Sequence, residues 1–433
     1  RLESRQQGRL DGLELTAHEV TEPALDEVRI RVLATGLNFR DVLNALGMYP
    51  GDAGPLGSEC VGIVEAVGPG VQDLACGDMV MAITPRGFCS RVNASAALTA
   101  RCPAGMAVGD AATIPIAFLT ADWALGELAQ LQSGERVLIH AAAGGVGMAA
   151  VQLAHAVGAE VFATAGSERK REVLRRMGVR HIYDSRSLDF REQILRDTDG
   201  DGVHVVLNSL SDEFIPASLE VLRQDGRFIE IGKTGVWDAA QVRTVRPEAD
   251  YHLLYLGEAC EREPERVRRR FLDLVARFES GELRPLPARA FLVDDAAAAF
   301  RYMAQARHIG KIVLFDSIDD ADAPDDGAIW ITGGLGGLGL ATARHLVERG
   351  WRRIALTSRN APSEAAQRQI EEFRARGAEV LLVAGDVSRL DEVIRMRGEI
   401  EDRGWRVRSV IHAAGVLADA VLPRQNWHGV ETV

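Results

Sequence analysis

Two glycine-rich segments have the residue types and the spacing that bind the phosphates of a dinucleotide. The first, Gly144-Gly145-Val146-Gly147, follows the apolar run at 136–139. The second follows the apolar run at 328–331 and contains Thr332, Gly333, Gly336 and Gly339. A strand that turns into a helix at such a loop lets the backbone approach a pyrophosphate, and the helix N-terminus offers it free N–H groups. The sequence therefore predicts two nicotinamide sites, or one site and the remnant of another.

Strands and helices alternate around both glycine segments, which is typical of doubly wound parallel sheets. Around the first segment we expect helices at 148–157 and 217–222 and strands at 137–139, 160–164, 181–183, 203–207 and 227–231. Around the second segment we expect strands at 329–332, 354–357, 380–384 and 409–412. Each glycine segment then lies at the carboxyl end of its first strand, where such sheets bind their ligands.

The N-terminal part has a different pattern, with short strands expected at 27–32, 62–67 and 79–83 between turn residues. This pattern predicts a small β-rich lobe, to which a helix at 267–279 and strands at 289–293 and 312–315 return. We therefore divide the α/β chain into four parts: a β-rich lobe (1–119 and 262–315), a first nucleotide domain (120–261), an acidic linker (316–326) and a partial second nucleotide domain (327–433).

Charge and composition exclude several classes of function. The formal net charge of −12 argues against nucleic acid as a partner, and we expect the cluster Arg266, Arg268, Arg269 and Arg270 to be a solvated helix face. No stretch approaches the roughly 18 apolar residues of a membrane span, so no membrane partner is expected. The five cysteines include no C-x-x-C pair, which favours neither disulfides nor structural zinc. The N-terminus has no apolar signal region and no Met, so we expect a cytoplasmic piece of something larger.

The end of the second strand distinguishes the two nicotinamide dinucleotides. A site for NAD places Asp or Glu there to accept hydrogen bonds from the ribose. Here the strand is followed by Ser167 and Lys170. We expect these two residues to contact a 2′-phosphate, so the expected cofactor is NADPH. The alternative is that Lys170, beside Glu168, is a surface helix residue.

Several motifs of the first 315 residues resemble the enoylreductase domain of modular type I polyketide synthases, a zinc-free branch of the medium-chain dehydrogenase/reductase superfamily. The motifs are Gly36–Leu43, Leu46–Pro50, Gly57–Glu59, Ala142–Gly147, Val206–Leu210 and Glu230–Thr234. The resemblance implies a GroES-like substrate lobe and a Rossmann domain that binds NADPH. It also implies neighbouring synthase domains and an enoyl substrate on the phosphopantetheine arm of an acyl carrier protein.

The chemistry that the resemblance implies needs hydride transfer and a proton donor but no metal. Zinc relatives need Cys and His ligands near positions where this chain has Asn38 and Ser58-Glu59. Tyr49 and Lys233 occupy the positions discussed as proton donors in the family, and we expect both to be catalytic. The alternatives are that Tyr49 packs on the lobe surface and that Lys233 is a phosphate contact or a solvent lysine.

The same resemblance implies a set of cofactor contacts. They are Asn38, Thr120, Gly144, Gly145, Val146, Gly147, Ser167, Lys170, Arg186, Asn208, Ser209, Leu210 and Gly232. Two positions depart from the family: Tyr255 stands where relatives often have Asp, and His204 replaces an Asp before the Leu-Asn-Ser motif. We expect His204 to be a satisfied strand-edge residue rather than a base. A Tyr at position 49 goes with a 2S product when the substrate carries an α-methyl branch.

The second glycine segment is similar to the nucleotide loop of short-chain dehydrogenases/reductases, and the segment after it resembles a ketoreductase. The resemblance implies that Arg359 holds a 2′-phosphate, that Asp386 flanks the adenine and that 412–415 lines the nicotinamide ribose. No Tyr follows Tyr302 and no Lys follows Lys311, so 327–433 is expected to bind nucleotide at most. Leu417-Ala418-Asp419 resembles the signature of B-type ketoreductases, or is an ordinary loop. The alternative for 327–433 is that it serves as a docking platform for the first domain.

The leading hypothesis is thus an NADPH-dependent enoyl reductase followed by a partial ketoreductase. A free-standing quinone or alkenal reductase of the same superfamily is the second hypothesis. A noncatalytic scaffold with vestigial nucleotide sites is the third.

Overall fold

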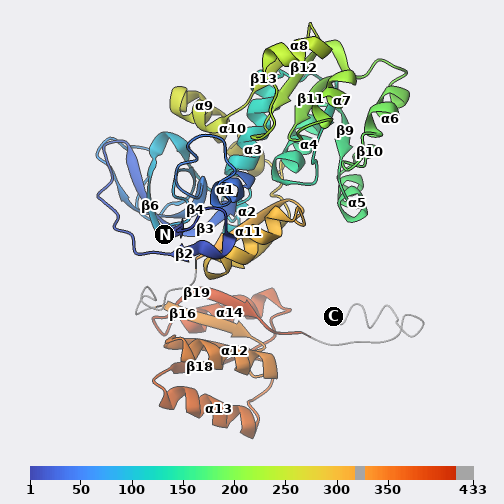
Figure 1. The fold of residues 1–433 in the computed structure, drawn as a ribbon. Coiled ribbons are helices and arrows are strands. Elements are labelled where there is room, and N and C mark those ends of the chain that lie inside the picture. The colour runs from blue at the N-terminus through green and yellow to red at the C-terminus, as the bar shows by residue number, and fades with distance from the viewer. Residues whose placement is uncertain (317–326, 416–433) are drawn as a thin grey trace, which may run out of the picture. The chain divides into compact units, whose positions relative to one another are not determined.

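The computed structural model describes residues 1–316 and 327–415, and most of the predicted linker and the segment Leu417–Asp419 lie outside these residues. The chain divides into two compact units, Arg1–Ser317 and Ile318–Val433 (Figure 1). The division within the first unit that we predicted at 119 and 261 stays a prediction. Each unit is described by itself below.

A parallel sheet forms one half of the first unit. Its strand order is β10-β9-β8-β11-β12-β13, and the strand bounds are β8 (Arg136–Ile139), β9 (Glu160–Thr164), β10 (His181–Tyr183), β11 (Val203–Asn208), β12 (Leu222–Glu230) and β13 (Asp250–Leu253). This confirms the strands predicted from 137 to 231, and adds β13 at the edge. The order reverses between β8 and β11, which places a ligand crevice at the carboxyl ends of these two strands.

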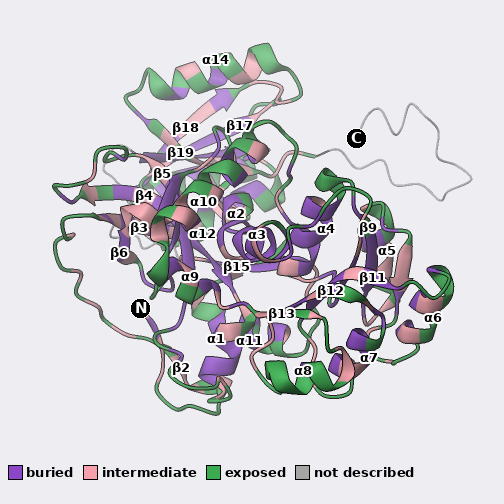
Figure 2. Cartoon of the chain, turned by 90° about the horizontal axis from the view of Figure 1, so that it is seen from above, coloured by how far each residue is buried: buried purple, intermediate pink, exposed green. Residues whose placement is uncertain are grey.

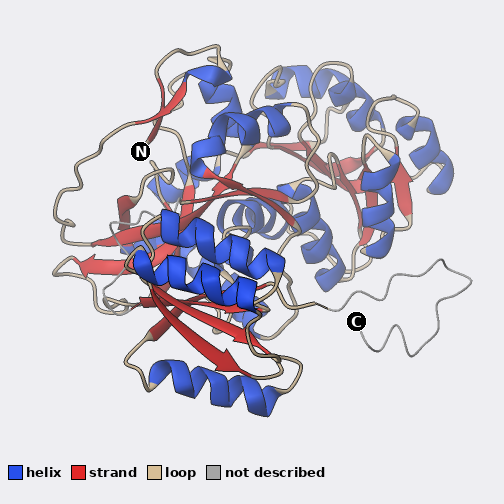
Figure 3. Ribbon diagram, turned by 90° about the horizontal axis from the view of Figure 1, so that it is seen from below, coloured by secondary structure: helices blue, strands red, loops and turns tan. Residues whose placement is uncertain are grey.

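Helices cover both faces of this sheet (Figure 3). Alternate strand residues, such as Val137 and Ile139, pack with α3 (Pro115–Asp122), α4 (Gly145–Val157) and α10 (Pro264–Glu279). The intervening residues, such as Leu138 and Phe162, pack with α6 (Phe190–Asp197), α7 (Phe214–Glu220) and α8 (Ala239–Val245). Because side chains alternate across a strand, strands buried on both faces read as continuous apolar runs. Helix α3 is buried almost throughout and is purple in Figure 2.

The other half of the first unit is a mixed sheet with the strand order β14-β15-β3-β4-β5-β7 and with β6 paired to β3. Its strands are β3 (Glu27–Leu37), β4 (Glu59–Val67), β5 (Met79–Ile83), β6 (Arg91–Ser95), β7 (Thr99–Arg101), β14 (Ala288–Leu292) and β15 (Lys311–Phe315). The predicted return of the chain is confirmed, because β15 pairs antiparallel with β3. The helices of this half are α1 (Phe39–Ala45), α2 (Val108–Ala111) and α11 (Ala296–Ala304), and β1 (Leu2–Ser4) pairs with β2 (Leu13–Leu15).

The arginine cluster on α10 differs from our expectation of a solvated face. Arg266 pairs with Glu127, Arg268 pairs with Asp73, and Arg270 pairs with Asp122 at 2.8 Å. Glu127 lies on a π-helical turn, Trp123–Leu128, which continues α3. The prediction was wrong for Arg268 and Arg270, because their partners come from segments more than 140 residues earlier in the chain. Arg269 is exposed as expected, and Arg266 also pairs with Glu263 of the acidic run that precedes the cluster.

The second unit contains a parallel sheet with the strand order β18-β17-β16-β19. The strands are β16 (Gly327–Thr332), β17 (Arg353–Ser358), β18 (Glu379–Ala384) and β19 (Arg406–His412), as the sequence predicted. Helices α12 (Gly337–Glu348) and α13 (Glu364–Ala375) pack on one face, and α14 (Leu390–Glu401) packs on the other. This order is the first half of a doubly wound sheet, with its reversal between β16 and β19.

Across the described parts of the chain, none of the helices combines the length and the apolarity that crossing a bilayer requires.

Candidate active site

The first glycine loop joins β8 to α4 as predicted. Gly144 is the N-cap of α4, and no side chain caps this helix end, so its first N–H groups are available to an anion. A Cβ on Gly147 would lie 2.5 Å from Ala142 Cα, a backbone contact that no side chain tolerates. The loop therefore fits the pyrophosphate of a dinucleotide, with Gly145 and Val146 in the first turn of the helix.

A second chain segment supports this loop from the side of the mixed sheet. The Gly310 N–H donates to the Ala143 oxygen at 2.8 Å, and Gly144 and Gly310 form an isolated parallel bridge. Gly310 has φ +66°, and a Cβ there would collide with the Pro287 carbonyl. Only glycine combines a positive φ with the absence of a Cβ, so this position requires glycine. Because Lys311, the next residue, is the first of β15, Gly310 fixes where that strand starts.

The expected 2′-phosphate contacts lie at the start of α5 (Glu168–Arg176). Ser167 is the N-cap, and its hydroxyl accepts from the Lys170 N–H at 3.4 Å. The Lys170 ammonium is half-buried and donates to the Ala306 oxygen at 2.8 Å. Burial is the main cause that lowers the pKa of Lys170, and the nearby charge of Arg186 acts in the same direction. These cations lie together, and their contact with a phosphate stays a prediction.

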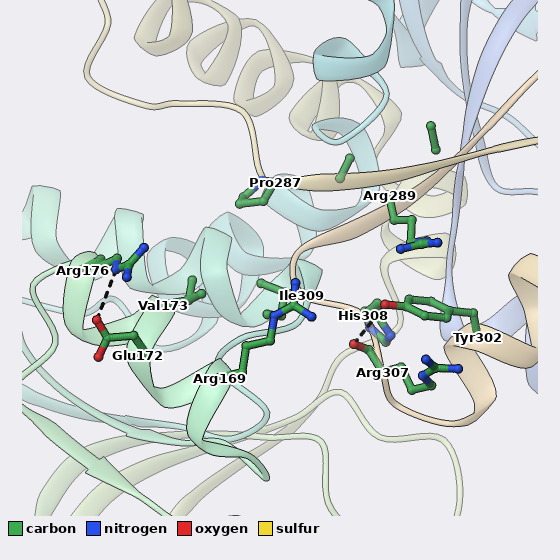
Figure 4. A pocket seen from close by; sticks show the side chains of 12 residues that line it. Arg169, Glu172, Val173, Arg176, Pro287, Arg289, Tyr302, Arg307, His308 and Ile309 are labelled. Carbon is green, nitrogen blue, oxygen red and sulfur yellow. Dashed lines mark hydrogen bonds and ion pairs between the residues drawn. The ribbon is translucent and has the colours of Figure 1, made fainter. Parts of the chain in front are cut away.

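A hollow of about 700 Å³ opens beside these residues, between α5 and the β14–α11 region (Figure 4). Four arginines line it: Arg169, Arg176, Arg289 and Arg307. The guanidinium carbons of Arg289 and Arg307 each lie 5.0 Å from the centre of the Tyr302 ring. Arg176 pairs with Glu172 at 3.2 Å. The hollow is therefore strongly basic in a chain whose net charge is negative.

Asn208, Ser209 and Leu210 form the loop after β11, next to the reversal of strand order. Asn208 is fully buried, and its amide nitrogen donates to the Leu210 oxygen at 2.7 Å and to Glu230 Oε2 at 2.5 Å. Glu230 Oε1 accepts from the Gly232 N–H at 2.6 Å. Asn208 and Glu230 thus hold the ends of β11 and β12 together. Burial raises the pKa of Glu230 to about 7.

Lys233 follows Gly232 just after the end of β12, as expected. Its ammonium nitrogen lies 3.5 Å from the centre of the Tyr255 ring and donates to the Leu254 oxygen at 3.3 Å. Burial lowers the pKa of Lys233 to about 8, and Arg40 acts in the same direction at longer range, whereas Glu258 and Glu230 oppose it. A lysine with a pKa near 8 can hold and release a proton close to neutral pH.

Tyr49 lies in the loop after α1 and belongs to the same cluster. The Arg40 guanidinium carbon lies 5.6 Å from the centre of its ring. Tyr49 is also close enough to Tyr255 to raise the pKa of that phenol, after the larger effect of burial. Three separate segments therefore bring Tyr49, Lys233 and Tyr255 together with Arg40. The structure places the two predicted catalytic residues in one neighbourhood.

A buried ion pair forms at Asn38 and Glu59, two positions compared above with those of zinc relatives. The Lys311 ammonium lies 2.7 Å from Glu59 Oε1 and donates to Asn38 Oδ1 at 2.5 Å. The Asn38 amide nitrogen donates to Glu59 Oε1 at 2.8 Å, and the Ile116 N–H donates to Glu59 Oε2 at 2.9 Å. Each Glu59 oxygen thus already accepts from the protein, and a lysine supplies the positive charge. These residues do not fit a zinc ion.

The remaining predicted contacts are placed as follows. Thr120 is buried on α3, Ser209 is exposed and Arg186 is exposed beyond β10. His204 Nδ1 accepts from the Arg136 N–H at 3.0 Å, so its ring is hydrogen-bonded as predicted, although its strand β11 lies inside the sheet between β8 and β12. The sequence reasoning assigned no role to Arg40, Glu230 or Lys311. A signal was present for Lys311 and Glu59, because each opens a strand, at least four uncharged residues follow it there, and the two charges are opposite.

The second glycine loop joins β16 to α12 in the same manner. Gly336 is the N-cap of α12 without a side-chain cap, and Gly333 has φ +64°. A Cβ on Gly339 would lie 2.6 Å from Gly334 Cα. The Thr332 hydroxyl bonds to His412 Nδ1 at 2.7 Å, which joins the ends of β16 and β19. Arg359 is exposed after β17, and its charge contributes to the lowered pKa of Asp386, whose main cause is the hydrogen bond from Ser388.

Known family models match three parts of the chain. They are described as an alcohol dehydrogenase GroES-like domain (24–117), a zinc-binding dehydrogenase (177–314) and a KR domain (327–433). The first unit therefore has the medium-chain dehydrogenase/reductase fold, a GroES-like lobe with a Rossmann domain. The second unit is a partial ketoreductase domain.

Solved structures and curated proteins narrow this class. The crystal structure of CurK enoyl reductase is 44% identical, with a TM-score of 0.70, and the match covers 73% of this chain and 98% of that one. Phenolphthiocerol synthesis polyketide synthase type I Pks15/1 of Mycobacterium marinum is 45% identical over 96% of this chain, and pikromycin polyketide synthase component PikAII of Streptomyces venezuelae is 44% identical over 94%. The chain spans 20% and 11% of the length of these two synthases. This chain belongs to the enoyl reductases of polyketide synthases and continues into a ketoreductase domain.

A quinone oxidoreductase of Escherichia coli, solved in complex with NADPH, has the same fold at 26% identity, with a TM-score of 0.68. That match covers 73% of this chain and 99% of the solved one. A nicotinamide cofactor is therefore common to the fold.

Proposed function

We propose that the first unit reduces the α,β double bond of a 2-enoyl thioester with NADPH as the reductant. The observation that carries this proposal is the cluster of Tyr49, Lys233 and Arg40 near the carboxyl end of β12. When bound, NADPH would supply the hydride that adds to the β-carbon of the thioester. The charge that then develops on the thioester oxygen needs nearby hydrogen-bond donors, because such donors lower the barrier most.

The roles of the two expected catalytic residues follow from their surroundings. The Lys233 ammonium and the Tyr49 hydroxyl each hold a proton that can be transferred to the α-carbon. Lys233 has a well-matched acidity, since its pKa is about 8 and efficient general acids have a pKa near the working pH. Tyr49 sets the face of the double bond that receives the proton, which yields the 2S product for an α-methyl substrate.

The choice of NADPH over NADH is supported by the cations at the start of α5. Lys170 and Arg186 lie together, and Arg169 and Arg307 line the adjacent hollow. A 2′-phosphate would find positive charge there, and Glu168, the acidic residue that follows β9, is already paired with Arg171 and Arg175.

The substrate is proposed to arrive on the phosphopantetheine arm of an acyl carrier protein within the same synthase. The polyketide synthase relatives support neighbouring synthase domains as partners. For the second unit we propose nucleotide binding through its own glycine loop. A cytoplasmic location stays a prediction.

A titration followed by a turnover assay tests the proposal. NADPH binding is measured by nicotinamide fluorescence on the full chain and on Gly147→Ala and Gly339→Ala, which block one loop each by a backbone collision. Crotonyl-pantetheine thioester is then offered, with a free quinone as the competing substrate. We expect turnover of the thioester that Gly147→Ala abolishes and Gly339→Ala retains. Preference for the quinone would favour a quinone reductase, and the absence of both binding and turnover would favour a scaffold.

A further inference from the structure

The ammonium of Lys233 packs against an aromatic ring rather than against a carboxylate. Its nitrogen lies 3.5 Å from the centre of the Tyr255 ring, which is well inside the range of cation–π contacts. Its other contact is the neutral Leu254 oxygen at 3.3 Å. The backbone between β13 and α9 (Leu256–Arg262) supplies both partners, because Leu254 and Tyr255 are consecutive residues there.

The position of Tyr255 is itself fixed by the fold. Tyr255 is the N-cap residue of α9 with an extended backbone, φ −120° and ψ 94°. Its neighbours Leu254 and Leu256 are buried, so the ring is held in place by the chain on both sides. The half-buried ring thus lies on an anchored stretch of backbone and presents its face to the lysine side chain.

Every charged group near Lys233 acts at longer range than this ring. Glu258 on α9 and Glu230 on β12 favour the charged amine, and Arg40 on α1 disfavours it. Tyr49 in the loop after α1 lies near Tyr255. The ring face attracts a cation through its quadrupole, but more weakly than a carboxylate in direct contact would.

We propose that Tyr255 is a positioning residue for Lys233, whose ring face holds the ammonium in the site in place of a carboxylate counter-ion. This inference rests on the proposed function, in which Lys233 donates the proton. In that step a Lys233 N–H bond breaks with its electron pair left on nitrogen, the enolate pair forms the new C–H bond, and the amine regains a proton from solvent. A carboxylate partner would hold this proton more tightly, whereas the ring orients the amine and still lets the proton leave.

Three substitutions separate the ring from other properties of the residue. Tyr255→Phe keeps the ring face, Tyr255→Leu removes it, and Tyr255→Asp places a carboxylate beside the amine. The proton affinity of Lys233 is measured on the full chain by the pH dependence of its acetylation with acetic anhydride, read by peptide mass spectrometry. The acetylation of Lys233 can be read separately, because the lysines of the chain are Lys170, Lys233 and Lys311 and they fall on different peptides.

The expected results are ordered. Lys233 of the unmodified chain and of Tyr255→Phe should titrate alike, near 8. Loss of the ring face in Tyr255→Leu should lower the midpoint by about half a unit to one unit, since the charged form loses its partner. Tyr255→Asp should raise the midpoint by about one unit or more. Tyr302→Leu, which removes the ring between Arg289 and Arg307, is the matched control and should leave the midpoint of Lys233 unchanged.

Turnover gives the second measurement. The high-pH limb of kcat for crotonyl-pantetheine should move in the same order as the midpoints. Near pH 8, kcat of Tyr255→Leu should fall about twofold to fivefold with KM little changed. Equal midpoints in Tyr255→Leu and the unmodified chain, or equal behaviour of Tyr255→Phe and Tyr255→Leu, would overturn the inference. Because acetylation needs no substrate, a chain without turnover would refute the proposed function while the midpoints still decide the role of Tyr255.

Discussion

Replacement of Lys311 by Met should destabilise the first unit far more than loss of an ordinary ion pair. Lys311 Nζ and Glu59 Oε1 are 2.7 Å apart, and their side chains are 4% and 0% exposed. Met has a similar length but no charge, so the carboxylate of Glu59 and the amide oxygen of Asn38 would both lose a buried donor. Removal of one partner from a buried pair costs about 3–5 kcal/mol. An exposed pair contributes about 0–1 kcal/mol.

The assay is urea unfolding of the full chain, followed by circular dichroism and fitted with one transition for each unit. The transition of the first unit should move to a urea concentration lower by about 1 M or more, for slopes of roughly 1–3 kcal/mol per M. The matched control is Arg176→Met, which breaks the exposed pair with Glu172 and should leave the transition of the first unit nearly unmoved, because solvent screens exposed pairs.

A double substitution isolates the reason for the loss. In Lys311→Met with Glu59→Gln, the new amide is neutral and its oxygen can accept from the Ile116 N–H. Its nitrogen can donate to Asn38 Oδ1 once the Asn38 amide, which now points its nitrogen at Glu59 Oε1, turns over. We expect this chain to regain about 2 kcal/mol relative to Lys311→Met alone, because no unpaired charge remains buried. The reasoning is refuted if Lys311→Met is as mild as Arg176→Met, or if the double substitution is no more stable than Lys311→Met.

The other predictions concern the cofactor loop, a buried acid and the product. Gly147→Ala should weaken NADPH binding to the first unit at least tenfold, because its Cβ would lie 2.5 Å from Ala142 Cα. The control is Gly257→Ala on α9, which should bind NADPH as before because a Cβ there meets nothing within 4 Å. Fluorescence titration with NADPH measures both affinities. The pKa of Glu230 is raised to about 7, so the stabilisation that comes from its protonated form is complete below about pH 4.5 and is lost as the pH rises through 7. The melting temperature of Glu230→Gln should therefore change less between pH 4.5 and pH 7 than that of the unmodified chain. Tyr49→Val should change the configuration at the α-carbon of an α-methyl product, as read by chiral chromatography, and an unchanged 2S product would exclude Tyr49 from setting the protonated face.

The strands and the nucleotide loops could be predicted from the sequence because their signals are local. Apolar runs bounded by glycines gave β8, β11 and β16 within a residue or two of their bounds. The edge strand β13 was missed, since Asp250-Tyr251-His252-Leu253 alternates in polarity over too few residues. The π-helical turn was missed as well, because its ion pairs with α10 join residues far apart in sequence.

The candidate site was predictable only where a family motif marked it. Tyr49 and Lys233 were named from motifs, and the structure brings them into one cluster. The sequence could not show that Tyr255 faces Lys233, because that contact depends on how β13 and α9 place one aromatic ring. Position 255 was noted only as a departure from an expected Asp. Direct cofactor contacts by Asn208 and Asn38 stay predictions, and both amides already bond within the protein.

The bridge between Gly144 and Gly310 has a mechanical consequence. The chain crosses from the parallel sheet to the mixed sheet near residue 286, yet the backbones meet again where Gly310 touches the loop at Ala143. An opening of the two halves that separated these backbones would break the Gly310–Ala143 hydrogen bond, close to where a pyrophosphate would rest. Binding of the nucleotide and relative motion of the two halves would then be coupled. A substrate that moved the halves apart would weaken binding of the cofactor.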